Sequence, residues 1–132
     1  MKNVFYFIAG ALFILLAATH TWFGLETALP VLYDSGIENS LITIFTFQLH
    51  MIGIQDFIYG IAAIIMAFQK DMSKVKFAAW LLIAILLARW AIMTLITFMY
   101  DLNNVIDLLT SSIAFFILIA LLLLGARVKD KS

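Results

Sequence analysis

Residues 41–68 read LITIFTFQLHMIGIQDFIYGIAAIIMAF and contain one acidic residue, Asp56, and no Lys or Arg. A predominantly apolar run needs about 20 residues to cross the hydrocarbon core of a bilayer as a helix. This stretch is longer, so we expect a transmembrane helix that tilts or projects beyond the membrane on one side. Further apolar runs of sufficient length occupy about residues 4–23, 77–100 and 105–126. The pattern predicts an all-α polytopic membrane protein, a four-transmembrane-helix antiparallel bundle forming one domain over residues 1–132.

The composition excludes several classes of protein. Of the 132 residues, 65% are hydrophobic and 12% are charged, and the mean hydropathy of +1.11 is too high for a water-soluble domain of this size. Cysteine is absent, which rules out disulfides, thiolate metal sites and a cysteine nucleophile. The formal net charge is zero and provides no electrostatic basis for a nucleic-acid partner. The lipid bilayer is therefore the predicted main partner.

Basic and acidic residues fall on opposite sides of a four-span arrangement. One side carries most of the basic residues, namely Lys2, Lys70, Lys74, Lys76, Arg127, Lys129 and Lys131. The opposite side carries acidic residues, namely Glu26, Asp34, Glu38 and Asp101. An excess of Lys and Arg marks cytoplasmic loops. We therefore expect a multi-pass protein of the bacterial inner (cytoplasmic) membrane, with both termini in the cytoplasm.

The predicted connections differ in composition. Residues 24–40 are rich in turn formers, such as Gly24 and Pro30, and are predicted to break the helix. Residues 101–104 form a tight turn, in which one of two adjacent asparagines is the expected N-cap of the last span. The remaining connection, residues 69–76, is a short basic turn.

Asp56 and Arg89 are charged residues deep inside the predicted spans. Counted outward from the basic turn, each lies about 13 residues along its helix, or roughly 20 Å at helical rise. Antiparallel helices would hold both at one depth, where ionisable groups face a partner or a polar cavity. We predict an intramembrane ion pair with two roles left open. It either fixes helix register, or lines a pocket in which Arg89 holds an anionic or carbonyl group and Asp56 orients it.

The second predicted span carries most of the polar residues inside the membrane. Gln48, Gln55 and Tyr59 fall within about 40° of one another at 100° per residue. Asp56 lies to one side of this stripe and His50 belongs to the same span. Because polar groups avoid lipid, we expect this broad face to point into the bundle.

A second polar layer is expected nearer the outer surface. His20, His50 and Asp107 reach comparable depths on three spans, and Thr94 and Thr97 on the remaining span lie close to it. Two histidines on facing helices can bind a metal, ligate haem axially or hydrogen-bond a quinone carbonyl. Asp107 would orient one imidazole. Haem b and a quinone are thus the candidate cofactors, and the alternative is that each histidine is a hydrogen-bonded packing residue.

Aromatic residues near the span ends are typical of interfacial belts. Trp22, Phe23 and Tyr100 lie at predicted outer ends, and Trp80 lies near an inner end. Trp90, deeper in its span and next to Arg89, either adds a ring to a pocket wall or faces lipid, and we expect the second.

The segment Gly53-Ile-Gln-Asp56-Phe-Ile-Tyr-Gly60 flanks its acid with two glycines that lie near one helical line and would let another helix approach closely. It resembles the Gly-x-x-acid-x-x-x-Gly pattern of the DoxX-like family of small four-helix membrane proteins. That family has Glu where this chain has Asp56, and a glycine-rich segment near His20. The resemblance implies four spans with both termini inside. Some members of the family resemble subunits of quinone-linked oxidoreductases or accessory proteins in redox homeostasis.

These features predict a membrane protein that binds a small hydrophobic or quinone-like ligand in an intramembrane polar pocket, as an accessory to a redox enzyme. The predicted ligand-binding residues are His20, Gln48, His50, Gln55, Asp56, Arg89 and Asp107. No catalytic or metal-binding set is predicted, and autonomous catalysis is not expected. Two alternatives stay open: a structural or assembly subunit of a membrane complex, and transport of a small solute or protons by an oligomer. The predicted partners are a membrane redox complex or further copies of the chain.

Overall fold

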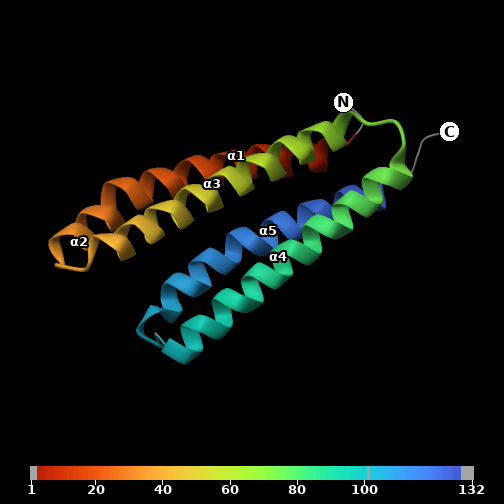
Figure 1. The fold of residues 1–132 in the computed structure, drawn as a ribbon. Helices are drawn as coiled ribbons and strands as arrows, with labels where there is room; N and C mark the ends of the chain where they lie inside the picture. The colour runs from red at the N-terminus through yellow and green to blue at the C-terminus, as the bar shows by residue number, and fades with distance from the viewer. Residues whose placement is uncertain (1–2, 101, 129–132) are drawn as a thin grey trace. The chain divides into compact units, whose positions relative to one another are not determined.

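The computed structural model describes residues 3–100 and 102–128. Four residues that contribute to the charge pattern lie outside the described residues, namely Lys2, Asp101, Lys129 and Lys131. The described chain is helical almost throughout (Figure 1), with elements α1 (Val4–Phe23), a π-helical turn (Gly24–Ala28), α2 (Leu29–Asp34), α3 (Asn39–Phe68), α4 (Met72–Tyr100), a 3-10 turn (Leu102–Asn104) and α5 (Val105–Arg127).

The helices of the described chain include four stretches that are long and apolar enough to cross a membrane. They are Val4–Asp34, Asn39–Phe68, Ser73–Tyr100 and Leu102–Arg127. Many large apolar side chains lie on the surface, such as Phe77, which is 73% exposed, and Ile106, which is 75% exposed. Extensive exposed apolar surface marks contact with a membrane. The predicted all-α, multi-pass membrane fold is confirmed.

The first helix continues past its predicted end, so the predicted break over residues 24–40 is wrong for the first half of that segment. The backbone widens into the π-helical turn, where the Leu29 N–H donates to the Gly24 carbonyl. Pro30 then lies in the first turn of α2, a position where proline is well tolerated. The chain turns only beyond α2, at Gly36, whose φ of 71° lies in the left-handed region that glycine adopts without strain.

Contacts divide the chain into two compact units. The central unit is residues 10–62, which comprise most of α1, the π-helical turn, α2 and most of α3. The terminal unit has residues 3–9 and 63–128 as its described residues, which comprise the start of α1, the end of α3, α4 and α5. Each unit is described below by its own contacts.

In the central unit, α1 and α3 run antiparallel and pack through glycines, as predicted (Figure 1). A Cβ atom on Gly60 would lie 2.9 Å from the Gly10 carbonyl oxygen and 3.2 Å from the Ile14 backbone nitrogen. Gly53 likewise lies directly against the Thr21 side chain. The missing side chains therefore allow the two backbones to approach closely, which is the usual basis of helix association in lipid.

In the terminal unit, α4 and α5 form an antiparallel hairpin (Figure 1), and Asn104 occupies the N-cap position of α5. Trp90 donates its indole N–H to the Ser112 hydroxyl at 2.8 Å, and its ring packs edge-to-face on Phe116 with centroids 5.3 Å apart. The Ser112 hydroxyl in turn donates to the Leu108 carbonyl at 2.7 Å. The expectation that Trp90 faces lipid is wrong, because α5 supplies an acceptor for its N–H group.

Asn3 joins three helix ends within the terminal unit. Its Oδ1 accepts hydrogen bonds from the N–H groups of Phe5 at 3.2 Å and Tyr6 at 3.4 Å, which caps α1. Its backbone N–H donates to the Ala67 carbonyl in the last turn of α3 at 3.1 Å. Its Nδ2 donates to the Gly125 carbonyl in the last turn of α5 at 2.8 Å. Asn3 is only 2% exposed, and we call this set of contacts the Asn3 clasp.

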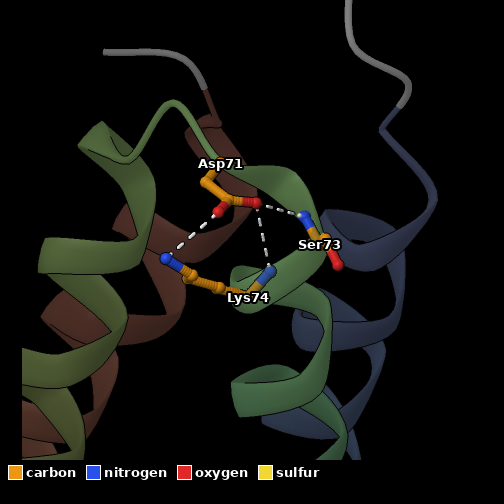
Figure 2. A network of polar contacts seen from close by, with 3 residues as sticks. All are labelled: Asp71, Ser73 and Lys74. Atoms are coloured by element: carbon orange, nitrogen blue, oxygen red, sulfur yellow. Dashed lines mark hydrogen bonds and ion pairs between the residues drawn. The ribbon is translucent and has the colours of Figure 1, made fainter.

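Asp71 caps α4 in the turn that follows α3 (Figure 2). Its Oδ1 accepts hydrogen bonds from the N–H groups of Ser73 at 3.1 Å and Lys74 at 3.4 Å. Its Oδ2 lies 3.5 Å from the Lys74 Nζ. These contacts favour the ionised carboxylate, and the Lys74 backbone N–H, which has the largest effect, lowers the pKa of Asp71 below its ordinary value of 3.8.

We expect Lys74→Ala to leave the pKa of Asp71 below 3.8, because both backbone N–H bonds survive the change. Lys74→Pro should give Asp71 a higher pKa than Lys74→Ala does, because proline has no backbone N–H to donate to the carboxylate. A carboxyl 13C NMR titration in micelles measures both variants. Since folding lowers this pKa, the cap stabilises the protein fully above about pH 3.8 and is lost as the pH falls through the folded-state pKa. Equal pKa values in the two variants would contradict the role given to the N–H group.

Candidate functional site

The predicted site residues are distributed over both units. The central unit contains His20, Gln48, His50, Gln55 and Asp56. Arg89 and Asp107 belong to the terminal unit. The predicted ion pair of Asp56 with Arg89 joins residues of different units, and it stays a prediction.

A groove with a volume of about 430 Å³ runs along the contact between α1 and α3 in the central unit. Its wall is mainly apolar, with contributions from Ala17, Ala18, Trp22, Gly53, Ile54 and Phe57. Helical spacing explains why these residues share the wall, because residues three, four and seven apart lie on one face of a helix. The small side chains leave the space that forms the groove, and the aromatic side chains form larger parts of its wall.

His50 and Thr21 are polar residues among those that line this groove. His50 precedes Ile54 and Phe57 on the same face of α3, so its imidazole lies beside their apolar side chains. Thr21 lies across the groove on α1, where it packs over Gly53. A concave apolar wall with a few polar groups is the usual form of a small-molecule site. The groove is therefore suited to an amphipathic molecule whose polar group reaches the imidazole.

His20 is exposed on α1 and is not among the residues that line the groove. On α1 it is separated by about 160° from both Ala18 and Trp22, which line the groove. Of the two histidines, His50 lines the groove and His20 does not, whereas axial ligation of a haem by both imidazoles would require both to face one cavity. Among the described residues, no group of three His, Asp or Glu side chains comes together as a metal site would require.

Asp56 also lies away from the groove, about 120° from His50 around α3. It is 7% exposed, as expected for an ionisable group at membrane depth. On the same flank, the Gln55 side-chain amide donates to the Tyr59 hydroxyl one turn along α3, and Gln48 is exposed. The polar face predicted for this span thus divides, with His50 in the groove and the other polar side chains on the opposite flank.

The polar groups of the terminal unit have surroundings of their own. The Arg89 guanidinium lies 5.5 Å from the centroid of the Phe115 ring, a cation–π contact between α4 and α5. Asp107 is exposed in the first turn of α5, where a helix favours negative charge. Thr97 donates to a carbonyl one turn earlier at 3.0 Å. The buried Thr94 hydroxyl has no hydrogen-bond partner among the described residues.

Sequence reasoning selected polar residues and missed two features. One is the apolar wall beside His50. The small residues Ala17 and Ala18 on one helix and Gly53 on the other could have indicated it, because neighbouring helices leave space where their side chains are small. The other is Asn3. An asparagine directly before an apolar run is a recognised helix-start signal, so its capping role was available from the sequence.

Comparisons with protein-family models, with curated proteins and with solved structures found no match to this chain. The resemblance of residues 53–60 to the DoxX-like motif stays a prediction.

Proposed function

We propose that this multi-pass membrane protein binds a small hydrophobic, quinone-like ligand in the groove between α1 and α3, as an accessory to a redox enzyme. The single observation that carries the proposal is the position of His50 in the wall of a mainly apolar groove of about 430 Å³. This volume falls within the range of roughly 300–1,000 Å³ that is common for small-molecule sites. The concentration of Lys and Arg near one set of span ends supports insertion into the bacterial inner membrane with both termini in the cytoplasm.

The chemistry of a quinone matches the residues of the groove. A quinone ring carries carbonyl oxygens that accept hydrogen bonds, and the His50 imidazole has an N–H group to donate. The faces of the ring would pack against aromatic side chains such as Trp22 and Phe57. An apolar tail would follow the remainder of the groove and continue into the bilayer.

The groups in the groove agree with an accessory role. Its described lining holds apolar side chains, a hydroxyl and an imidazole, and none of these transfers electrons at ordinary potentials. In this proposal, a partner enzyme oxidises or reduces the ligand. The resemblance of residues 53–60 to the DoxX-like family, some of whose members resemble subunits of quinone-linked oxidoreductases, agrees with this role.

A structural or assembly subunit is the second candidate function. It is favoured by polar side chains whose hydrogen bonds lie within the protein, such as Trp90 with Ser112 and Asn3 with Gly125. In this case the protein would co-purify with larger membrane subunits and would bind no quinone. The binding experiment that follows separates the two functions.

We expect His50→Ala to weaken binding of a short-chain benzoquinone about tenfold, the equivalent of one hydrogen bond of roughly 1–1.5 kcal/mol. Trp22 lines the groove and can report binding, because quinones quench indole fluorescence. Trp80→Phe and Trp90→Phe would leave Trp22 as the single tryptophan. The quinone is then titrated into liposomes that contain the reconstituted protein, and the dissociation constant is read from the quenching curve.

His20→Ala is the matched control, because His20 is an exposed histidine of the same unit that lies outside the groove. It should bind the quinone as the parent protein does. Ala18→Leu should block binding by filling the groove while His50 stays intact. Equal quenching in the parent, His50→Ala and Ala18→Leu proteins would show that the quinone meets Trp22 only by diffusion in the bilayer, and would reject the proposal.

A further inference from the structure

The Asn3 clasp gathers positive charge at one end of the terminal unit. Asn3 binds the Ala67 carbonyl through its backbone N–H and the Gly125 carbonyl through its side-chain amide. Lys70 follows Ala67 by three residues, and Arg127 follows Gly125 by two. Two cations from distant parts of the sequence are thereby held at the same end of the unit.

Lys76, near the start of α4, adds a third cation at this end, and we call Lys70, Lys76 and Arg127 the basic rim. All three side chains are exposed. Within the described part of the chain, no acidic group forms an ion pair with them. Lys74 differs, because it is paired with Asp71 at 3.5 Å in the same turn (Figure 2). The basic rim therefore presents positive charge that the described acids do not neutralise.

The basic rim coincides with the ends of the membrane spans. One span ends at Phe68, the next begins at Ser73, and the last ends at Arg127. Phe77 and Trp80, in the first turns of the second of these spans, are largely exposed. Tryptophan is a residue type that gathers at the level of lipid head groups. The three cations are thus expected at the level of lipid phosphates, with exposed apolar side chains near them in sequence.

We propose that the basic rim binds the phosphate of an anionic lipid head group. Clusters of Lys and Arg next to a membrane span attract anionic lipids, with each cation contributing about a fivefold gain in affinity. A lipid can satisfy both parts of this surface, because its phosphate meets the cations while its acyl chains cover Phe77 and Trp80. Free phosphate would meet only exposed surface cations in water, where such contacts are weak.

The experiment uses Trp80, which lies one turn beyond Lys76 on the same face of α4 and reports the lipid beside it. Trp22→Phe and Trp90→Phe make Trp80 the single tryptophan. The full-length protein is reconstituted in phosphatidylcholine bilayers that contain brominated phosphatidylglycerol or brominated phosphatidylcholine. Quenching should show a preference for phosphatidylglycerol of roughly fivefold or more. The combined change Lys70→Gln, Lys76→Gln and Arg127→Gln should reduce this preference by roughly fivefold or more.

The control is the double change Asp71→Asn with Lys74→Gln, which removes two charges from the same turn without altering the net charge. It should keep the preference. A triple variant that retains the preference for phosphatidylglycerol would overturn the proposal. The proposal would also be overturned if the parent protein lost this preference when inorganic phosphate is added at constant ionic strength. If the triple variant does not fold, Lys76→Gln alone is compared with the parent, and an unchanged preference there overturns the proposal as well.

Discussion

Gly60→Val should destabilise the protein by about 3 kcal/mol, at the upper end of the range for overpacked interiors. The reason is the contact that its Cβ would make, 2.9 Å from the Gly10 carbonyl oxygen and 3.2 Å from the Ile14 backbone nitrogen. These are backbone atoms of α1, which cannot rotate away as a side chain can. The added methyl groups can be accommodated only if α1 and α3 separate, and separation also weakens the neighbouring contact at Gly53.

Equilibrium unfolding in mixed detergent micelles, followed by circular dichroism, measures the loss of stability. Gly60→Ala should give a smaller loss, because one methyl group can be accommodated by a smaller displacement. Ala120→Val adds the same two methyl groups on an exposed position of α5 and should change the free energy of unfolding by less than about 0.5 kcal/mol. A Gly60→Val protein as stable as the parent would contradict the close approach of α1 and α3.

Asn3→Ala should destabilise the protein by about 2–4 kcal/mol. The change removes the cap of α1, which contributes about 1 kcal/mol in comparable helices. It also removes the hydrogen bond to the Gly125 carbonyl, which is a buried contact. A buried polar group left without its partner costs about 1–3 kcal/mol. The same unfolding measurement tests this value, and hydrogen exchange of the Phe5 and Tyr6 N–H groups reports the cap directly.

Asn3→Ser separates the two contributions, because serine can cap α1 but cannot reach the Gly125 carbonyl with an amide. Its stability should fall between those of the parent and Asn3→Ala. Asn103→Ala, in the exposed 3-10 turn, is the matched control and should be nearly neutral. Since Asn3 lies in the terminal unit and the groove in the central unit, we expect Asn3→Ala to retain quinone affinity while it is folded. Stability equal to that of the parent would show that the clasp contributes nothing.

The membrane spans were predictable because they depend on a local quantity, the length of an apolar run. Helix α3 begins at Asn39 and ends at Phe68, close to the predicted residues 41–68. The packing role of Gly53 and Gly60 was predictable for the same reason, since their spacing places both on one helix face. The predicted break over residues 24–40 failed in its first half, because turn propensity is a weak influence where a π-helical turn continues the helix and proline lies in the first turn of α2.

The site was only partly predictable. Hydropathy identified His50 as an unusual residue within a span, but it carried no information on which flank of the α1–α3 pair the imidazole occupies. That flank depends on the helix face that packs against α1, where Gly53 and Gly60 admit the neighbouring backbone. The same rotation places His20 and Asp56 away from the groove. Trp90 was misplaced for a similar reason, since its acceptor, Ser112, lies on another helix.

The amino-acid sequence by itself determined that the protein lies in a membrane, the number of spans and, except for the continuation of the first span to Asp34, the approximate ends of the helices. These follow from how many consecutive residues avoid water and charge. Tertiary structure alone decided which side chains share a surface. His50 meets an apolar wall, and Asn3 reaches the carbonyls of Ala67 and Gly125, through contacts between residues far apart in the chain. Such contacts depend on the rotation and axial register of each packed helix, which apolar runs of nearly uniform composition specify only weakly.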